Sequence, residues 1–152
     1  EFETVLNHLE VDVIEILFNV FFQDVSSLFK KAKEKGISLI AKVPLDSGWL
    51  TGKYDELSEF EGIRMRWDDE TIARRAQLVR KMKEITQTDD LTRFAISFIL
   101  SYPEITAVIH GIKTLEQLED HIKNANFKLD PKMKKRMVEL YLQDIKKDPL
   151  PW

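Results

Sequence analysis

Two apolar segments separated by one amphipathic helix constrain the fold of this chain more than any other feature. Residues 11–19 and 37–43 are rich in branched aliphatic side chains and lack helical periodicity, which is typical of buried strands. Between them, residues 24–35 carry apolar side chains at helical spacing, and Gly36 follows where a left-handed residue ends a helix. The second strand is apolar almost throughout, which favours a parallel strand covered on both faces. A right-handed β–α–β unit is therefore predicted.

The rest of the chain alternates helices with one further strand. Residues 106–109 are predicted to form a third strand, and residues 44–67 a long irregular loop of a kind that is uncommon unless it is functional. Apolar periodicity and capping residues predict helices over residues 2–9, 68–85, 91–101, 114–122 and 130–144. The fold class is therefore α/β, with about three parallel strands and flanking helices in a single domain over residues 1–152.

Composition excludes several classes of protein. With 43% hydrophobic and 32% charged residues, the chain is neither disordered nor of low complexity. A net charge of -3 argues against a nucleic-acid partner, which usually selects a basic excess. Cysteine is absent and the three histidines lie far apart, so neither disulfides nor a metal site are expected. The absence of cysteine fits a cytoplasmic location. Apolar runs fall short of the roughly 20 residues that span a bilayer, so no membrane partner is expected.

The first candidate site follows the second predicted strand. Residues 43–54 contain Gly48 and Gly52, which permit a tight backbone path, and Lys53, which adds positive charge. Amide groups exposed along such a path can cradle phosphate oxygens. The alternative is an ordinary loop with turn glycines, and the residues alone leave it open.

The second candidate site follows the third predicted strand. Gly111 and Lys113 precede Thr114, which is placed to cap a helix, with Gln117 completing a capping box. A basic residue at a capped helix N-terminus is a plausible anion site. The alternative is a plain capping box beside a solvated lysine.

The third candidate is a carboxylate within the first predicted strand. Strict alternation puts Glu15 and Leu17 on one face and Ile16 and Phe18 on the other. A carboxylate in so apolar a strand costs free energy unless it has a partner, which makes Glu15 a candidate for function. The alternative is an edge position at which Glu15 reaches water.

Together these segments resemble the C-terminal half of an aldo-keto reductase. The similarity is carried in order by residues 35–41, 44–48, 50–54 and 108–111, then by Thr114, Gln117 and Leu118. The resemblance implies a (β/α)8 TIM-type barrel of which this chain would supply the last three strands. It also implies reduction of a small carbonyl substrate with a nicotinamide cofactor, NADP. The chain begins inside a predicted helix without a capping residue, so we expect an N-terminal half of the barrel to be absent, making the chain a fragment.

The resemblance also assigns roles to individual residues. Glu15 stands where the family usually has a glutamine for the nicotinamide carboxamide, and Phe18 where it usually has a stacking tyrosine. His121 stands where an asparagine usually faces the adenine. The pyrophosphate would be lined by Pro44, Leu45, Asp46, Ser47, Gly48, Leu50 and Lys53, with Arg64 in the same clamping loop; the adenosine ribose and its 2′-phosphate would be surrounded by Gly111, Lys113, Thr114 and Gln117, with Asp120 and His121 nearby. The family's catalytic residues lie on earlier strands, so no catalytic residue is assigned in this chain.

Three functions remain open at this point. The first is the cofactor-binding half of an NADP-dependent aldo-keto reductase, inactive when isolated. The second is a non-enzymatic regulatory or assembly module of the same ancestry. The third is an unrelated small α/β nucleotide-binding domain. Whichever holds, three parallel strands leave two open sheet edges, which predicts self-association.

Overall fold

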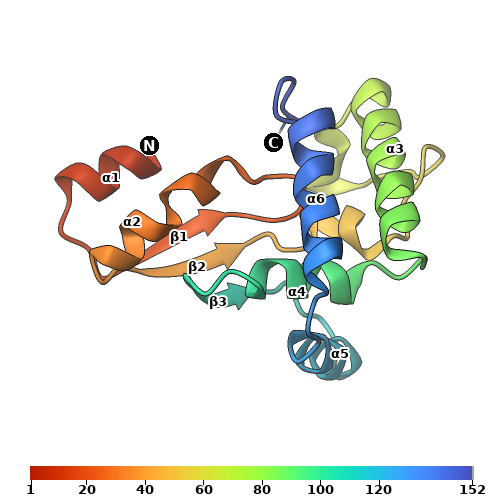
Figure 1. The fold of residues 1–152 in the computed structure, drawn as a ribbon. Helices are drawn as coiled ribbons and strands as arrows, with labels where there is room; N and C mark the ends of the chain where they lie inside the picture. The colour runs from red at the N-terminus through yellow and green to blue at the C-terminus, as the bar shows by residue number, and fades with distance from the viewer. Residues whose placement is uncertain (152) are drawn as a thin grey trace.

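Three parallel strands form the centre of the molecule. The computed structural model describes residues 1–151, apart from the side chain of Ile63. The strands are β1 (Val13–Leu17), β2 (Ser38–Lys42) and β3 (Ile105–Ile109), and they pair in the order β1-β2-β3 (Figure 1). Glu15 lies opposite Ile40, and the register between β2 and β3 shifts once, between Leu39 and Ile40. The predicted α/β fold with three parallel strands is confirmed.

Helices cover one face of this sheet and also lie beyond the carboxyl ends of its strands. Strand–helix boundaries agree with the sequence prediction to within a few residues, and Asp68 and Thr114 accept hydrogen bonds as N-caps. Among residues 1–151, no helix combines the length and apolar content that a membrane crossing requires. The helices are α1 (Phe2–His8), α2 (Phe29–Glu34), α3 (Asp69–Thr86), α4 (Thr92–Leu100), α5 (Leu115–Ala125) and α6 (Pro131–Asp144), with short 3-10 turns η1 (Asp24–Leu28), η2 (Asp46–Thr51) and η3 (Gly62–Arg66).

Two predicted segments differ in detail. The helix predicted over residues 24–35 begins as the 3-10 turn η1, where Ser27 Oγ donates to the Asp24 carbonyl and competes with regular helical pairing. It ends as expected at Gly36, whose φ of +73° is left-handed. The loop predicted over residues 44–67 contains the two short turns η2 and η3.

One face of the sheet is covered and the other is open. On the covered face, Phe18 packs against Phe29 at 4.9 Å and Phe98 at 5.8 Å between ring centroids, beneath α2 and α4. On the other face Val13 is 51% exposed and Ile109 49% exposed. In β2 itself, Leu39 and Ala41 are buried while Ser38, Ile40 and Lys42 are half-buried, so the predicted cover is complete on one face only among the described residues.

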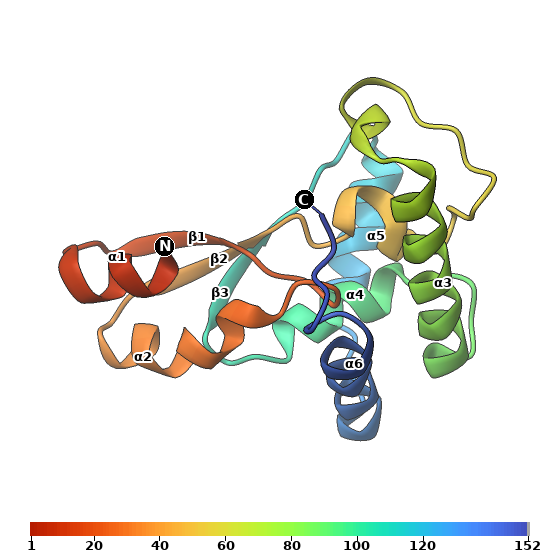
Figure 2. The same ribbon diagram turned by 90° about the horizontal axis from the view of Figure 1, so that it is seen from above.

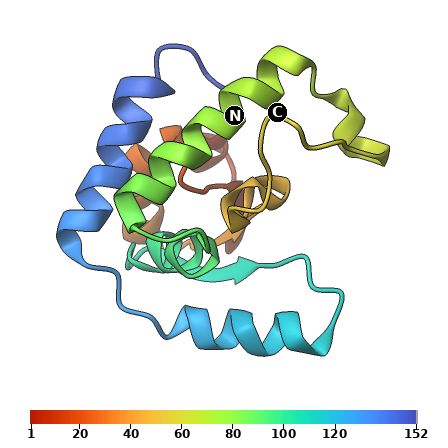
Figure 3. The ribbon, with the colours of Figure 1, turned by 90° about the vertical axis from the view of Figure 1, so that its right-hand side faces the viewer.

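The carboxyl ends of the strands point toward η2, α3 and α6 (Figures 1 and 2). Helices α3 and α6 lie side by side there, while α5 is set apart and packs on α4 (Figure 3).

Candidate functional site

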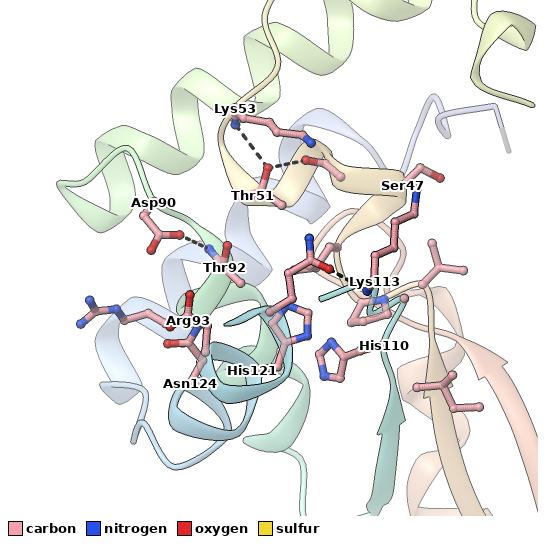
Figure 4. Close-up of a pocket in the computed structure, with 18 of the residues that line it drawn as sticks. Ser47, Thr51, Lys53, Asp90, Thr92, Arg93, His110, Lys113, His121 and Asn124 are labelled. Carbon is pink, nitrogen blue, oxygen red and sulfur yellow. Dashed lines mark hydrogen bonds between the residues drawn. The ribbon is translucent and has the colours of Figure 1, made fainter. Parts of the chain in front are cut away.

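A cleft of about 990 Å³ lies at the carboxyl ends of β2 and β3 (Figure 4). Residues 42–53 and Arg64 form one side, which we call the turn wall, and residues 109–127 form the other, the helix wall. The start of α4 closes the cleft between them with Asp90, Thr92 and Arg93. The volume lies at the upper end of the range for ligand sites, about 300–1,000 Å³.

The lining of the cleft is strongly basic. Two carboxylates, Asp90 and Asp120, face it, against the six cations Lys42, Lys53, Arg64, Arg93, Lys113 and Lys123. Such a concentration of one sign of charge in a concave surface raises the local concentration of anions. The cleft is therefore suited to a ligand with several negative charges, such as phosphate groups.

The backbone of the turn wall adopts left-handed conformations at residues other than glycine. Val43, Asp46 and Ser47 have φ values of +56°, +45° and +57°. An L-residue in this region costs roughly 1–2 kcal/mol, so other contacts must hold the turn. Gly48, with φ +105°, also needs to be glycine, because a Cβ there would lie 2.9 Å from the ring of Tyr54.

Three side chains from outside residues 43–48 hold the backbone of this turn. Asn19, at the end of β1, is fully buried and its Nδ2 donates to the Val43 carbonyl at 2.9 Å. Arg64 Nε donates to the Ser47 carbonyl at 3.0 Å. The third contact is a buried ion pair between Asp46 and Arg75. Burial raises the pKa of Asp46 to about 6, although Arg75 opposes the shift.

The helix wall is held by its own cap. Thr114 Oγ1 accepts from the Gln117 amide at 3.3 Å, as the sequence predicts. The side chain of Gln117 accepts from the amide of Lys113 at 2.8 Å (Figure 4), one residue earlier than a regular capping box. The Lys113 side chain is exposed at the cleft, so its charge is available to a ligand.

Two histidines meet on the helix wall (Figure 4). The rings of His110 and His121 lie 4.4 Å apart, and His121 is 9% exposed. Each ring has a buried Nδ1 without a hydrogen-bond partner among residues 1–151. Burial lowers the pKa of His110 to about 4, with repulsion from His121 adding to the shift, and burial also lowers the pKa of His121. Both rings are neutral near pH 7, because the pKa of each lies below its ordinary value, so they add no charge to the helix wall.

The structure brings most of the residues predicted for the site to this cleft. A Cβ at Gly111 would meet no described atom within 4 Å, so a ligand can approach its backbone closely. Cations stand on both walls of the cleft, an arrangement that suits a ligand carrying more than one phosphate group. The predicted residues that line the cleft are Pro44, Leu45, Ser47, Gly48, Lys53, Arg64, Gly111, Lys113, Gln117, Asp120 and His121.

Five predicted residues lie elsewhere. Glu15 is exposed on the open face of β1, an edge strand, which is the alternative that the sequence left open. Phe18 is fully buried in the aromatic cluster, so its ring is not presented to the cleft. Leu50 is fully buried, Thr114 acts as the cap of α5, and the Asp46 side chain points into the interior toward Arg75.

Several cleft residues were not predicted from the sequence as cofactor-binding residues. Lys42 ends an otherwise apolar strand, and that basic residue was the available signal. Arg93 and Asn124 reach the cleft through the packing of α4 and α5, for which no local pattern exists. Within residues 1–151, no group of three or more histidine, aspartate and glutamate side chains is arranged to hold a metal ion.

Comparison with known proteins matches the chain to one family and to reductases. The model of the aldo/keto reductase family matches residues 4–142. The chain is 30% identical over 113 residues to L-glyceraldehyde 3-phosphate reductase of Escherichia coli K12, covering 68% of this chain and 33% of that protein. It is 25% identical over 130 residues to aldo-keto reductase str7 of Strobilurus tenacellus, covering 78% of this chain and 39% of that protein. The chain thus spans about a third to two-fifths of the length of these relatives.

Solved structures show the same fold. Aldo-keto reductase AKR11C1 from Bacillus halodurans, in its apo and holo forms, superposes with a TM-score of 0.70 at 18% sequence identity. The match covers 91% of this chain and 46% of that one.

Proposed function

The chain belongs to the aldo/keto reductase family, and on that premise we propose that it is the cofactor-binding part of an NADP-dependent carbonyl reductase. Membership of the family supports an oxidoreductase and a nicotinamide cofactor, and it removes the alternative of an unrelated nucleotide-binding domain. The observation that carries the proposal is the cleft at the ends of β2 and β3, with six cations on its walls. Among the relatives, aldo-keto reductase yakc of Schizosaccharomyces pombe has NADP(+) in its name.

Each wall has a role in this proposal. Lys53 and Arg64 on the turn wall bind the pyrophosphate, and Lys113 on the helix wall binds the 2′-phosphate. His110 and His121, which are neutral, contact the adenine. The bound nicotinamide supplies the hydride that reduces a carbonyl. The protein's contribution from this chain is to bind and orient the cofactor.

Catalysis needs groups that we do not assign to this chain. Proton donation to the forming alkoxide typically contributes 10²–10⁴-fold, and we propose that this donor and the substrate pocket belong to an N-terminal half of the barrel. The isolated chain is then expected to show no NADPH oxidation with reactive aldehydes. Sustained turnover that is abolished by Lys53→Ala would overturn the half-barrel interpretation.

Calorimetric titration of NADPH and NADH tests the proposal. Lys113→Ala removes a charge-assisted contact worth about 1.5–3 kcal/mol, so the Kd for NADPH should rise by about 10- to 100-fold. Affinity for NADH, which lacks the 2′-phosphate, should change little. Lys128→Ala is the matched control, because Lys128 is exposed and lies outside the cleft. Absence of NADPH binding, or equal weakening of both cofactors, would refute the assignment.

A second candidate is an assembly module, and it is favoured by apolar surface. Val13, Ile109, Leu115 and Ile122 are 49–65% exposed on the open face of the sheet and on α5. In addition, β1 and β3 each pair with one strand among the described residues. We propose that these surfaces self-associate. Sedimentation velocity should show concentration-dependent oligomers; a monomer at every concentration would contradict this candidate.

A further inference from the structure

Arg75 and Asp46 form an ion pair in the interior of the molecule. Among the ion pairs within residues 1–151, this is the one in which neither side chain exposes any surface. Arg75 comes from α3, while Asp46 lies in the left-handed turn directly before Ser47 and Gly48, which line the cleft. The pair therefore joins a long helix to the strained part of the turn wall.

Arg75 contacts two further segments. Its Nη2 donates to the carbonyl of Pro151 at 2.9 Å, and its guanidinium lies 5.1 Å from the ring centroid of Trp67. The same side chain thus holds the turn wall, the segment before α3 and the C-terminal tail. The neighbouring Arg74 donates to the Asp144 carbonyl at the end of α6 at 3.2 Å, and it holds the tail separately through the Asp148 carboxylate at 2.9 Å.

Stability alone does not account for this pair. Asp46 Oδ1 and Arg75 Nε have no hydrogen-bond partner in the described part of the chain, so both ions are incompletely compensated for their lost hydration. Replacing such a pair with uncharged residues is often neutral or stabilising. The ion pair instead fixes the position of Asp46, whose φ of +45° is a conformation that the backbone disfavours.

We propose that Arg75 is a positioning residue for the cofactor cleft, which it shapes by holding Asp46 and hence the left-handed turn at Asp46, Ser47 and Gly48. The inference rests on the proposed function of the cleft. Arg75 lies behind the turn and does not line the cleft. Arg75 therefore affects a ligand indirectly, through the backbone of Ser47 and Gly48. Because Arg75 also donates to the Pro151 carbonyl, the position of the tail is linked to the shape of the turn wall.

A double variant separates positioning from folding. Asp46→Asn with Arg75→Met removes both charges together, so no unpaired ion is left buried, and asparagine tolerates a left-handed φ. The amides of Gly48 and Leu50, which donate to the Leu45 carbonyl at 2.8 and 3.1 Å, should exchange hydrogen about 10-fold or more faster. The Kd for NADPH should rise by about 10- to 100-fold, as expected for a misplaced binding group, while the melting temperature changes little.

The matched control is Lys81→Met with Asp144→Asn. This pair also joins α3 to another segment, at 2.5 Å, but it lies outside the cleft and is partly exposed. Unchanged exchange at Gly48 and Leu50 in the folded Asp46→Asn/Arg75→Met protein would overturn the proposal, and so would unchanged NADPH affinity. If the wild-type chain binds no NADPH, the proposed function fails, and the exchange of these two amides still decides the positioning role.

Arg75→Lys serves if the double variant does not fold. Lysine keeps a positive charge beside Asp46 but lacks the planar fork that also reaches the Pro151 carbonyl. Faster exchange at Gly48 and Leu50 than in wild type is expected. Exchange equal to wild type at both amides would overturn the role of Arg75.

Discussion

The two walls of the cleft are built in different ways. The turn wall is held from behind by Asn19 and Arg75 and within the cleft by its own Arg64, and its backbone adopts conformations that it would not adopt alone. The helix wall rests mainly on α4, and two of its apolar residues, Leu115 and Ile122, are 65% and 58% exposed. A ligand thus meets one wall whose shape is set by tertiary packing and one whose shape depends mainly on local capping.

The largest expected effect comes from crowding the turn wall. A Cβ at Gly52 would lie 2.0 Å from the Asp89 carbonyl oxygen, and the residue has φ +85°. Gly52→Ala must therefore separate two backbone segments, and we expect a loss of about 3 kcal/mol or more in the free energy of unfolding. Urea denaturation measures it.

Gly62→Ala is the control for that substitution. Gly62 is also left-handed, with φ +60°, but a Cβ there would meet nothing within 4 Å. Its expected cost is the conformational strain alone, roughly 1–2 kcal/mol. Equal losses in the two variants would show that the turn wall is not tightly packed and would remove the contrast between the walls.

On the helix wall, a smaller loss in the free energy of unfolding is expected as the pH falls, because of His110. Because burial lowers the pKa of His110 to about 4, below the ordinary histidine value of about 6.5, the unfolded chain binds this proton first as the pH falls. The contribution of His110 to stability is therefore present above about pH 6.5 and lost as the pH falls toward 4. Asp46 acts in the opposite direction, since its raised pKa of about 6 makes protonation favour the folded state.

Comparing wild type with His110→Phe isolates this contribution, because Asp46 is common to both. Between about pH 7 and about pH 5, wild type should lose on the order of 1 kcal/mol more stability than the variant, a figure discounted for the solvent that reaches His110. Identical pH dependence in the two proteins would contradict the buried, neutral state of this ring.

The elements of the fold could be predicted because their signals are local. The β–α–β pattern of residues 11–43, the left-handed Gly36 and the cap at Thr114 all depend on neighbours within a few positions. Hydrophobic periodicity and capping chemistry are sufficient there. The cap of the helix wall, which is local, was accordingly predicted, whereas lining residues such as Lys123 and Asn124 were not.

Most residues that line the turn wall were predicted, but its backbone conformation was not, because distant residues determine it. Left-handed conformations at Val43 and Ser47 have no sequence signature, since neither residue favours them. The contacts that hold them reach 24 residues along the chain from Asn19 and 29 from Arg75. Asp46 was assigned to the cofactor because of its position within residues 44–48, whereas its side chain forms the buried ion pair with Arg75.

The central claim is that the cleft between the two walls binds a nicotinamide dinucleotide, and amide chemical shifts during titration with NADP⁺ test it most directly. Saturable shifts are expected on both walls, at Gly48 and Lys53 and at Gly111 and Gln117. Glu3 in α1 and Glu139 in α6, outside the cleft, should not respond. Shifts absent from the cleft, or confined to one wall, would contradict the account.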